Sequence, residues 1–365
     1  MKPPILHIVD PAMSTHMGHH REINMALAQG MRARGYEVRV WVNKTYSVSN
    51  LDRSIAGIEI KPYFSVNPYA VFNSEGLSDL VERYDLAEAA FEREIQQLKL
   101  TGTVHVPNLF SYQLRGLSQL HTQHLSACVH HHPTRYSEQG EIFWSQSWVR
   151  VASALSHMKI VVVEEQMVNE MNRCIQSPMG VTRVPFPLAE SRMKPQTHRP
   201  QTIGILGGVR REQGLRYIDQ TINIINSLGV EVVLQDVKGV LSDRVKSKRV
   251  QWLGFTHQFN EALALCGAVL LNYDPVAYRF MGSGILWEAA SHGIVVLYTR
   301  GTAMSTMARQ YGIGLDFSYL NKDSLKQAMT TYIEHHDQLH ARAQIVATQL
   351  RAEHSVSLHL DQVFA

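Results

Sequence analysis

Short runs of apolar, β-branched residues alternate along the chain with longer segments in which apolar residues recur every three or four positions. Residues 5–9 form the first apolar run, and residues 20–34 carry apolar side chains at helical spacing up to Gly35, a residue type that favours helix ends. Residues 36–42 form the next apolar run. A strand, a helix and a second strand in this order predict a βαβ unit with parallel strands and a right-handed crossover.

The same alternation continues to the end of the chain. In the first half we expect further strands at residues 58–62, 103–106, 126–130, 159–163 and 182–185, and helices at 77–99 and 145–156. In the second half we expect strands at residues 202–206, 231–235, 250–253, 268–271, 294–297 and 313–315, and helices at 215–228, 284–292, 322–334 and 336–350.

A polar stretch with two prolines and no periodicity separates these two series, from Leu188 to Gln201. We therefore expect an N-terminal domain at residues 1–187, a linker at 188–201 and a C-terminal domain at 202–345. The last residues, 346–365, are expected to form a helix and tail that pack back toward the N-terminal domain. The predicted fold class is α/β, with two tandem Rossmann-like domains, and the cleft between the domains is the expected ligand site.

Composition agrees with two globular domains and excludes several functional classes. The chain has 365 residues, of which 45% are hydrophobic and 18% are charged, and its net charge is +3. A balanced charge makes a broad nucleic-acid-binding face improbable, so an anion site would have to be local. Three scattered cysteines predict buried thiols, and the absence of a long apolar run or a leader predicts a cytoplasmic protein. The unusual number is 19 histidines.

Two groups of histidines follow predicted strands of the first domain. Gly18, His19 and His20 lie between the first strand and the first helix, where glycine permits close approach to a ligand and a neutral imidazole can act as a general base. The alternative is that both histidines are exposed helix-cap residues. The second group, residues 130–132, is a run of three histidines at a strand end, where His130 and His132 would share one face. These side chains could line the cleft, bind a metal or serve only the structure.

Two loops of the second domain carry features of anion binding. After the strand at 202–206, Gly207 and Gly208 precede Arg210 and Arg211, and exposed backbone amides beside arginines suit a diphosphate, although a tight turn also needs glycine. The second loop, residues 278–283, precedes a helix.

That second loop, with the helix that follows it, has the more specific pattern. It contains Arg279, and then Ser283, Gly284 and Ile285 begin the helix, whose first amides form an anion site. Glu288, one turn later, can accept two hydrogen bonds from a ribose diol; the alternative is a solvated helix residue.

These motifs together resemble GT-B-fold glycosyltransferases, most nearly the group 1, family 4-like bacterial glycan glycosyltransferases typified by sucrose-phosphate synthase and cell-surface glycan transferases. The resemblance covers the whole chain in outline and is most specific at residues 283–296. It implies that the C-terminal domain binds a nucleotide sugar and the N-terminal domain binds the acceptor. It also implies that Glu288 binds the ribose and that the amides of Gly284 and Ile285 meet the diphosphate.

The resemblance implies roles for the first domain as well. His130 is similar to a histidine near the transferred sugar, and Gly18 with His19 is similar to the glycine turn after the first strand. Histidine at that turn is the base in inverting members, so His19 and His130 are the catalytic candidates. Gly18, His20 and His132 are then the acceptor-side candidates.

Three positions depart from the family pattern. Phe280 replaces the first of two glutamates, and Gly208 and Gln213 occupy the positions of a phosphate-binding arginine and lysine. Arg210, Arg211 or Arg279 would have to supply the missing charge.

The function implied is transfer of a hexose from a UDP- or GDP-linked donor to a glycan, lipid-linked or small-molecule acceptor. The donor is a substrate, and neither a metal nor a cofactor is expected. The expected location is the cytoplasm, with peripheral contact at the inner membrane face left open. The alternatives are a sugar-nucleotide epimerase on the same fold and a non-catalytic nucleotide-binding partner subunit.

Overall fold

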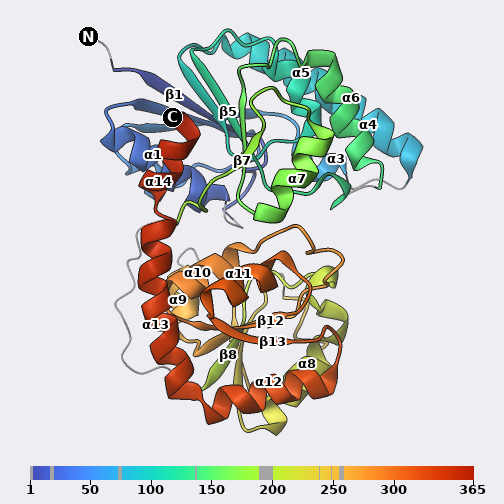
Figure 1. Ribbon diagram of the computed structural model, residues 1–365, viewed down its shortest axis with the longest axis vertical. Coiled ribbons are helices and arrows are strands. Elements are labelled where there is room, and N and C mark those ends of the chain that lie inside the picture. The colour runs from blue at the N-terminus through green and yellow to red at the C-terminus, as the bar shows by residue number, and fades with distance from the viewer. Residues whose placement is uncertain are drawn as a thin grey trace. The chain divides into compact units, whose positions relative to one another are not determined.

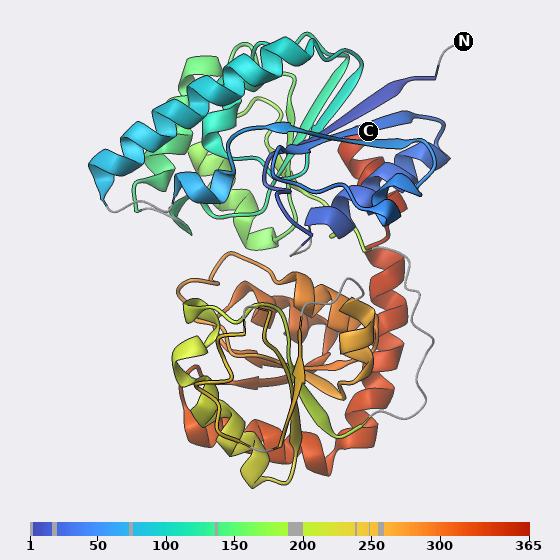
Figure 2. The same ribbon diagram turned by 180° about the vertical axis from the view of Figure 1, so that it is seen from behind.

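The computed structural model describes residues 3–16, 20–72, 76–135, 138–188, 200–237, 239–247, 249–254 and 259–365. The chain divides into two compact units, Met1–Ala189 with Ser355–Ala365, and Glu190–His354. Within each unit, helices cover both faces of one twisted sheet (Figures 1 and 2). The predicted class, two α/β domains with parallel sheets, is confirmed.

The sheet of the first unit has seven parallel strands in the order β3-β2-β1-β4-β5-β6-β7. The strands are β1 (Ile5–Asp10), β2 (Glu37–Asn43), β3 (Ile58–Phe64), β4 (Thr103–Val106), β5 (His124–Val129), β6 (Lys159–Val162) and β7 (Val181–Arg183). The helices are α1 (His20–Ala33), α2 (Asn50–Arg53), α3 (Pro68–Val71), α4 (Leu77–Leu98), α5 (Leu114–Leu117), α6 (Gly140–Val151), α7 (Glu165–Cys174) and α14 (Val356–Phe364).

The sheet of the second unit has six parallel strands in the order β10-β9-β8-β11-β12-β13. The strands are β8 (Thr202–Ile205), β9 (Glu231–Gln235), β10 (Val250–Leu253), β11 (Ala268–Leu271), β12 (Val295–Thr299) and β13 (Gly314–Phe317). The helices are α8 (Ile218–Ser227), α9 (Phe259–Ala264), α10 (Gly284–Ser291), α11 (Ala303–Tyr311), α12 (Lys322–Glu334) and α13 (His336–Glu353).

Each sheet reverses its strand order at one place, and that place positions the candidate site. The order turns back between β1 and β4 in the first unit and between β8 and β11 in the second. At such a switch point the loops after two neighbouring strands leave toward opposite faces and open a crevice at the carboxyl ends of the strands. The predicted motifs of three loops follow β1, β8 and β11 at these switch points, and the run of three histidines follows β5.

The apolar runs form strands because both faces of each sheet are covered. Val295 to Thr299 of β12 are all buried, as are Ala268 to Leu271 of β11. A strand buried on both faces needs a continuous apolar run rather than alternation. The three cysteines are buried, as expected.

The last helix, α14, belongs to the first unit although α13 belongs to the second. The helices α14 and α1 lie side by side (Figure 1). Leu360 packs against Gly30 of α1, and Arg34, which follows α1, forms an ion pair with Asp361 at 2.7 Å. The side chain of His359, on the buried face of α14, is 2% exposed, and its Nδ1 lies 2.7 Å from the carbonyl oxygen of Pro185. The expected division at residue 346 falls inside α13, and the segment joined to the first unit begins at Ser355.

Most predicted elements form within one or two residues of the expected bounds, and the exceptions have physical reasons. The helix expected at residues 145–156 is α6, which begins five residues earlier at Gly140, where a side chain would collide with the Pro133 carbonyl oxygen. Two of the longer helices, α7 and α11, were not expected. Their buried faces rely mainly on methionine, alanine, cysteine or serine rather than on aliphatic repeats. Among the described residues, no helix is both long and apolar enough to cross a membrane.

We expect Gly314→Ala to lower the free energy of unfolding by about 1–3 kcal/mol, the range for forcing extra volume into packed structure. A Cβ at Gly314 would lie 1.8 Å from the backbone oxygen of Val296 in the neighbouring strand. Urea unfolding measures the loss. Gly254→Ala is the control, since no atom lies within 4 Å of its Cβ position, and equal stability of the two variants would contradict the packing argument.

Candidate active site

The glycine loop after β8 and the start of α10 are in direct contact. Gly207 has φ +77°, and its amide donates to Oε1 of Gln235 at 2.8 Å. A Cβ at Gly207 would lie 2.7 Å from Cδ1 of Ile285, the second residue of α10. Position 207 therefore requires glycine for two reasons: its backbone conformation and the close approach of Ile285. The structure brings together two motifs that are almost eighty residues apart in the sequence.

Arg210 is held over this loop by hydrogen bonds. Its backbone amide and its Nε both donate to Oε1 of Gln213, at 3.2 and 3.3 Å. Its Nη2 donates to the Tyr278 hydroxyl at 3.3 Å, and Nε2 of Gln213 donates to the same hydroxyl at 3.1 Å. Gln213 thus orients the arginine.

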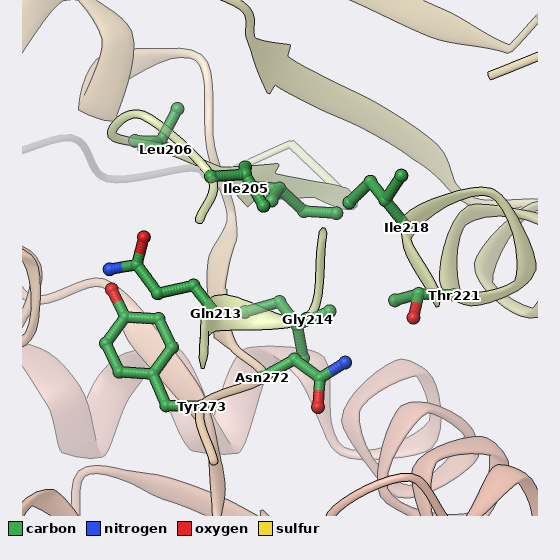
Figure 3. Close-up of a pocket in the computed structure, with 10 residues that line it drawn as sticks. Ile205, Leu206, Gln213, Gly214, Ile218, Thr221, Asn272 and Tyr273 are labelled. Atoms are coloured by element: carbon green, nitrogen blue, oxygen red, sulfur yellow. The ribbon is translucent and has the colours of Figure 1, made fainter. Parts of the chain in front are cut away.

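Tyr273 connects this group to the helix start. Its ring lies against Tyr278 with centroids 4.5 Å apart, and its hydroxyl is 3.4 Å from the Ser283 hydroxyl. Figure 3 shows the Gln213 amide beside the Tyr273 hydroxyl. Burial, and next the neighbouring Tyr278, raise the pKa of Tyr273, so this hydroxyl keeps its proton at neutral pH and serves as a hydrogen-bond group.

A small pocket opens beneath the loop at the switch point (Figure 3). Leu206, Gln213, Asn272 and Tyr273 are among its lining residues, and they come from the loops after β8 and β11. This is where the strand order predicts a crevice.

The α10 start has the geometry expected of an anion site. Ser283 precedes the helix, and its hydroxyl faces Tyr273 rather than capping a helix amide. The amides of the first turn are the groups that bind anions at a helix N-terminus. Glu288 follows Gly284 by one turn, so the two residues share a helix face. Its side chain is 31% exposed, and one carboxylate oxygen is 3.9 Å from Nδ1 of His292.

Three other candidate residues of the second unit, Gly208, Arg211 and Arg279, are exposed to solvent. Gly208 is exposed, and a Cβ there would meet nothing within 4 Å. Arg211 is exposed on the loop after β8. Arg279 is also exposed, and its guanidinium lies over the Phe280 ring, 5.0 Å from the centroid. Arg210 is exposed as well, but its hydrogen bond to Tyr278, which packs against Tyr273, connects it to the group beside the start of α10.

The switch point of the first unit carries a buried carboxylate. Asp10 ends β1 and is 1% exposed, and it accepts hydrogen bonds from His20 Nδ1 at 3.0 Å, Asn24 Nδ2 at 2.8 Å and the Ala12 amide at 3.1 Å. Burial alone would raise the pKa of Asp10, but His20 and these hydrogen bonds hold it below its usual value. Burial likewise opposes the charge of His20, but Asp10 raises the pKa of His20 above its usual value.

Tyr69 continues the hydrogen bonding that starts with Asp10 and His20. Nε2 of His20 lies 2.8 Å from the hydroxyl of Tyr69, which belongs to the short helix α3. The same hydroxyl accepts from Asn108 Nδ2 at 3.3 Å and lies 3.3 Å from Nε2 of His131. Asp10, His20, Tyr69 and His131 thus form a continuous row of hydrogen-bonding groups, which we call the Asp10–His131 row.

The three consecutive histidines go to three different places. β5 ends at Val129, so the alternation expected of a strand does not apply, and the prediction that His130 and His132 share one face is wrong. His131 is the histidine that joins Tyr69 and His20. Burial, and then His20 and His359, lower the pKa of His130 to about 4, so its imidazole is neutral at pH 7.

His132 lies in a separate polar cluster. Its Nδ1 pairs with Thr134, and its Nε2 is 3.6 Å from a Glu170 carboxylate oxygen. Ligand atoms of His132, Glu141 and Glu170 lie within 4.8 Å of one another, a spacing that could hold a metal. Arg173, however, forms ion pairs with both carboxylates. This is an ion-paired cluster on α6 and α7, away from the Asp10–His131 row.

Gly18 and His19 lie outside the described residues. Tyr273, Tyr278, Asp10, Tyr69, Asn108 and His131 were missed as site residues. Asp10 could have been found because it ends the first strand at the expected switch point. The tyrosines gave no sequence signal.

Comparisons with known proteins agree with this architecture. No family model matches the sequence, and no curated protein matches it. Similar solved structures include sucrose-phosphate synthase from Thermosynechococcus elongatus, with 13% identity, a TM-score of 0.67 and coverage of 99% of this chain and 98% of that one. WaaG, a glycosyltransferase involved in lipopolysaccharide biosynthesis, has 12% identity, a TM-score of 0.67 and 98% coverage of both chains. Anabaena HepE in complex with UDP and glucose has 13% identity, a TM-score of 0.66 and coverage of 99% and 98%. The expected GT-B fold is confirmed over the full chain.

Proposed function

We propose that this protein is a glycosyltransferase that moves a sugar from a nucleotide-sugar donor to an acceptor hydroxyl. The observation that carries the proposal is the contact of Gly207 with Ile285, which places a glycine loop, Arg210 and a helix N-terminus at one switch point of a GT-B fold. The similar structures named above include a sucrose-phosphate synthase, a glycosyltransferase and one complex with UDP and glucose.

The second unit would bind the donor. The diphosphate carries negative charge that grows as its bond to the sugar breaks, and preorganised positive groups stabilise that charge. Arg210 and the first amides of α10 would supply them, and Glu288 would accept hydrogen bonds from the ribose hydroxyls. Because protein groups provide the positive charge, the proposed reaction uses neither a metal ion nor a cofactor.

The first unit would bind the acceptor at the β1–β4 switch point, near His20 and His131. A UDP- or GDP-linked hexose is the proposed donor class. A glycan, lipid-linked or small-molecule acceptor fits the same chemistry. We propose a cytoplasmic location for the protein.

We expect Arg210→Ala to weaken binding of the nucleoside diphosphate about 10- to 100-fold while leaving binding of the nucleoside nearly unchanged. A hydrogen-bonded charge pair contributes about 1.5–3 kcal/mol, and only the diphosphate offers Arg210 a charge. Glu288→Gln should weaken both ligands, because both contain the ribose. Calorimetry with UDP, GDP, ADP and uridine or guanosine measures these effects.

Arg300→Ala is the matched control, because Arg300 is also an exposed arginine of the second unit with a carboxylate partner, Asp316 at 2.7 Å, as Arg210 has Glu212 at 3.6 Å. Its nucleotide affinity should equal that of the wild type. If none of the nucleotides raises the melting temperature of the wild type, the donor site is refuted, since a ligand of the native state must stabilise it.

Conversion of the sugar nucleotide without an acceptor would indicate an epimerase. Binding without transfer or hydrolysis would indicate a non-catalytic subunit.

A further inference from the structure

We propose that Tyr278 is a positioning residue of the donor site, whose hydroxyl fixes the Arg210 guanidinium in the orientation that binds the diphosphate. This inference rests on the proposed function and deepens it, because it gives a role to a side chain that acts on the donor through another residue. Tyr278 is 3% exposed and lies in the loop after β11, 68 positions from Arg210. Diphosphate binding should therefore depend on a residue that no local sequence pattern marks.

Tyr278 is itself held in place by its backbone and by its ring. Its amide donates to the carbonyl oxygen of Asp274 at 2.9 Å. Its carbonyl oxygen accepts from the amide of Ala303, the first residue of α11, also at 2.9 Å. Its ring packs against that of Tyr273, with the centroids 4.5 Å apart. These contacts give the Tyr278 hydroxyl a defined position in the second unit.

The loop after β8, which carries the arginine, is joined to the loop after β11 at two points. The carbonyl oxygen of Glu212 accepts from the amide of Asp274 at 2.9 Å. Gly214 has φ +80°, and a Cβ there would lie 2.9 Å from Nδ2 of Asn272, so the two backbones pack closely. Because the loops are joined at both points, the hydroxyl and the guanidinium extend from backbones in a fixed relation.

Two uncharged acceptors hold the Arg210 guanidinium at two of its nitrogens. Nε donates to Oε1 of Gln213 at 3.3 Å, and Nη2 donates to the Tyr278 hydroxyl at 3.3 Å. A guanidinium is planar, so hydrogen bonds from two of its nitrogens fix the direction of the plane, whereas a single one lets the plane turn. An amide and a phenol also leave the positive charge of the arginine uncancelled.

A nearby carboxylate makes the second hydrogen bond important. Oε1 of Glu212 lies 3.6 Å from Nε of Arg210, and the arginine side chain is 63% exposed. A long exposed side chain with several partners has several orientations of similar energy, and confining it to one of them on ligand binding costs free energy. The Tyr278 hydroxyl favours one orientation before the donor arrives. Removal of the hydroxyl therefore adds this cost to donor binding.

The test is the nucleotide affinity of Tyr278→Phe, measured by calorimetry with UDP, GDP and ADP and with the matching nucleosides. This variant keeps the ring that packs against Tyr273 and removes only the hydroxyl. We expect the diphosphate affinity to fall about 3- to 10-fold, the usual effect of ordering one long side chain, while nucleoside affinity changes less than twofold. Tyr311→Phe is the control, because the Tyr311 hydroxyl donates to Glu353 at 2.6 Å, outside the donor site, and its affinities should equal those of the wild type.

A double variant tests whether Tyr278 acts through Arg210. If it does, Tyr278→Phe has no further effect once Arg210 is replaced by alanine, and the double variant should bind the diphosphate within twofold of Arg210→Ala. If the two residues act independently, the effects add and the double variant binds another 3- to 10-fold more weakly than Arg210→Ala, on the order expected for Tyr278→Phe alone. Additive effects would overturn the positioning role.

The outcomes separate this inference from the proposed function. If the wild type binds nucleotide and Tyr278→Phe binds it equally well, the positioning role alone fails. Equal loss of diphosphate and nucleoside affinity in Tyr278→Phe would show a general disturbance of the site, and it would also overturn the positioning role. If the wild type binds no nucleotide, the proposed donor site fails and the positioning role fails with it.

Discussion

The free energy of unfolding should fall steeply as the pH is lowered from 6.5 to 4. Burial lowers the pKa of both His130 and His359 from 6.5 to about 4, so the folded protein keeps these rings neutral throughout this range. The unfolded chain binds protons on both rings below pH 6.5. Because the unfolded state then binds more protons, acid favours it, and each group contributes at most about 3 kcal/mol of lost stability by pH 4.

Other titratable side chains of the first unit change the free energy of unfolding, some in the same pH range and some in a different one. Burial also lowers the pKa of His7 to about 4 and that of His105 well below its usual value, and both therefore add to the acid loss. The His20–Asp10 pair behaves differently. The raised pKa of His20 gives stability that is complete below pH 6.5 and is lost as the pH rises through the folded-state pKa. The lowered pKa of Asp10 matters only in stronger acid.

Urea unfolding at a series of pH values measures this dependence. His359→Asn keeps a side-chain donor for the Pro185 carbonyl but cannot bind the proton, so the fall between pH 6.5 and 4 should become shallower by about 3 kcal/mol. His121→Asn, at an exposed position of the same unit, should retain the wild-type dependence. A pH profile that His359→Asn leaves unchanged would show that burial of this ring does not control the acid response.

Replacement of Asp10 by alanine should destabilise the protein by about 3–5 kcal/mol, the cost of breaking a buried ion pair by removal of one partner. The change leaves the partly buried His20 ring without its carboxylate and removes the acceptor for Asn24 and for the Ala12 amide. Thermal and urea unfolding at pH 7 measure the loss.

Two further variants separate the effect of losing the Asp10–His20 ion pair from other effects of the substitution. Asp10→Asn keeps an oxygen acceptor and should lose less than Asp10→Ala. Asp79→Ala breaks an exposed pair with Arg83 at 2.8 Å and should cost no more than about 0.5 kcal/mol. If Asp10→Ala and Asp79→Ala had equal stability, Asp10 would not be the buried counter-charge that its contacts indicate.

The sequence predicted the fold well because a parallel sheet covered on both faces demands apolar runs, and these are visible locally. Four strands match their expected bounds, as β11 does at Ala268–Leu271. Where an element depends on its tertiary surroundings, the sequence was a poorer guide. For the last helix, α14, a helix and tail that pack toward the first domain were expected within residues 346–365, but the bounds of the helix, Val356–Phe364, were not.

The candidate site was predictable to the extent that its signals are local. The Gly284 helix start and the Gly207 loop were recognised because each is a short strand–turn–helix pattern. The Asp10–His131 row was not recognised, because His20 and Tyr69 are 49 positions apart and Tyr69 and His131 are 62 apart. A run of three histidines also does not show where the strand ends. The strand ends at Val129, and the three rings that follow have different neighbours.

The placement of α14 has a consequence for synthesis of the protein on the ribosome. The first unit needs Ser355–Ala365 to complete its surface, yet these residues are made after the whole of the second unit. At about 5–20 residues per second, roughly ten to thirty seconds separate the two events. During that time the groove that later receives Leu360 and His359 has no helix to fill it. The N-terminal unit of this chain therefore becomes complete only after the second unit has been made, and a fragment that stops at Ala189 would keep that groove open.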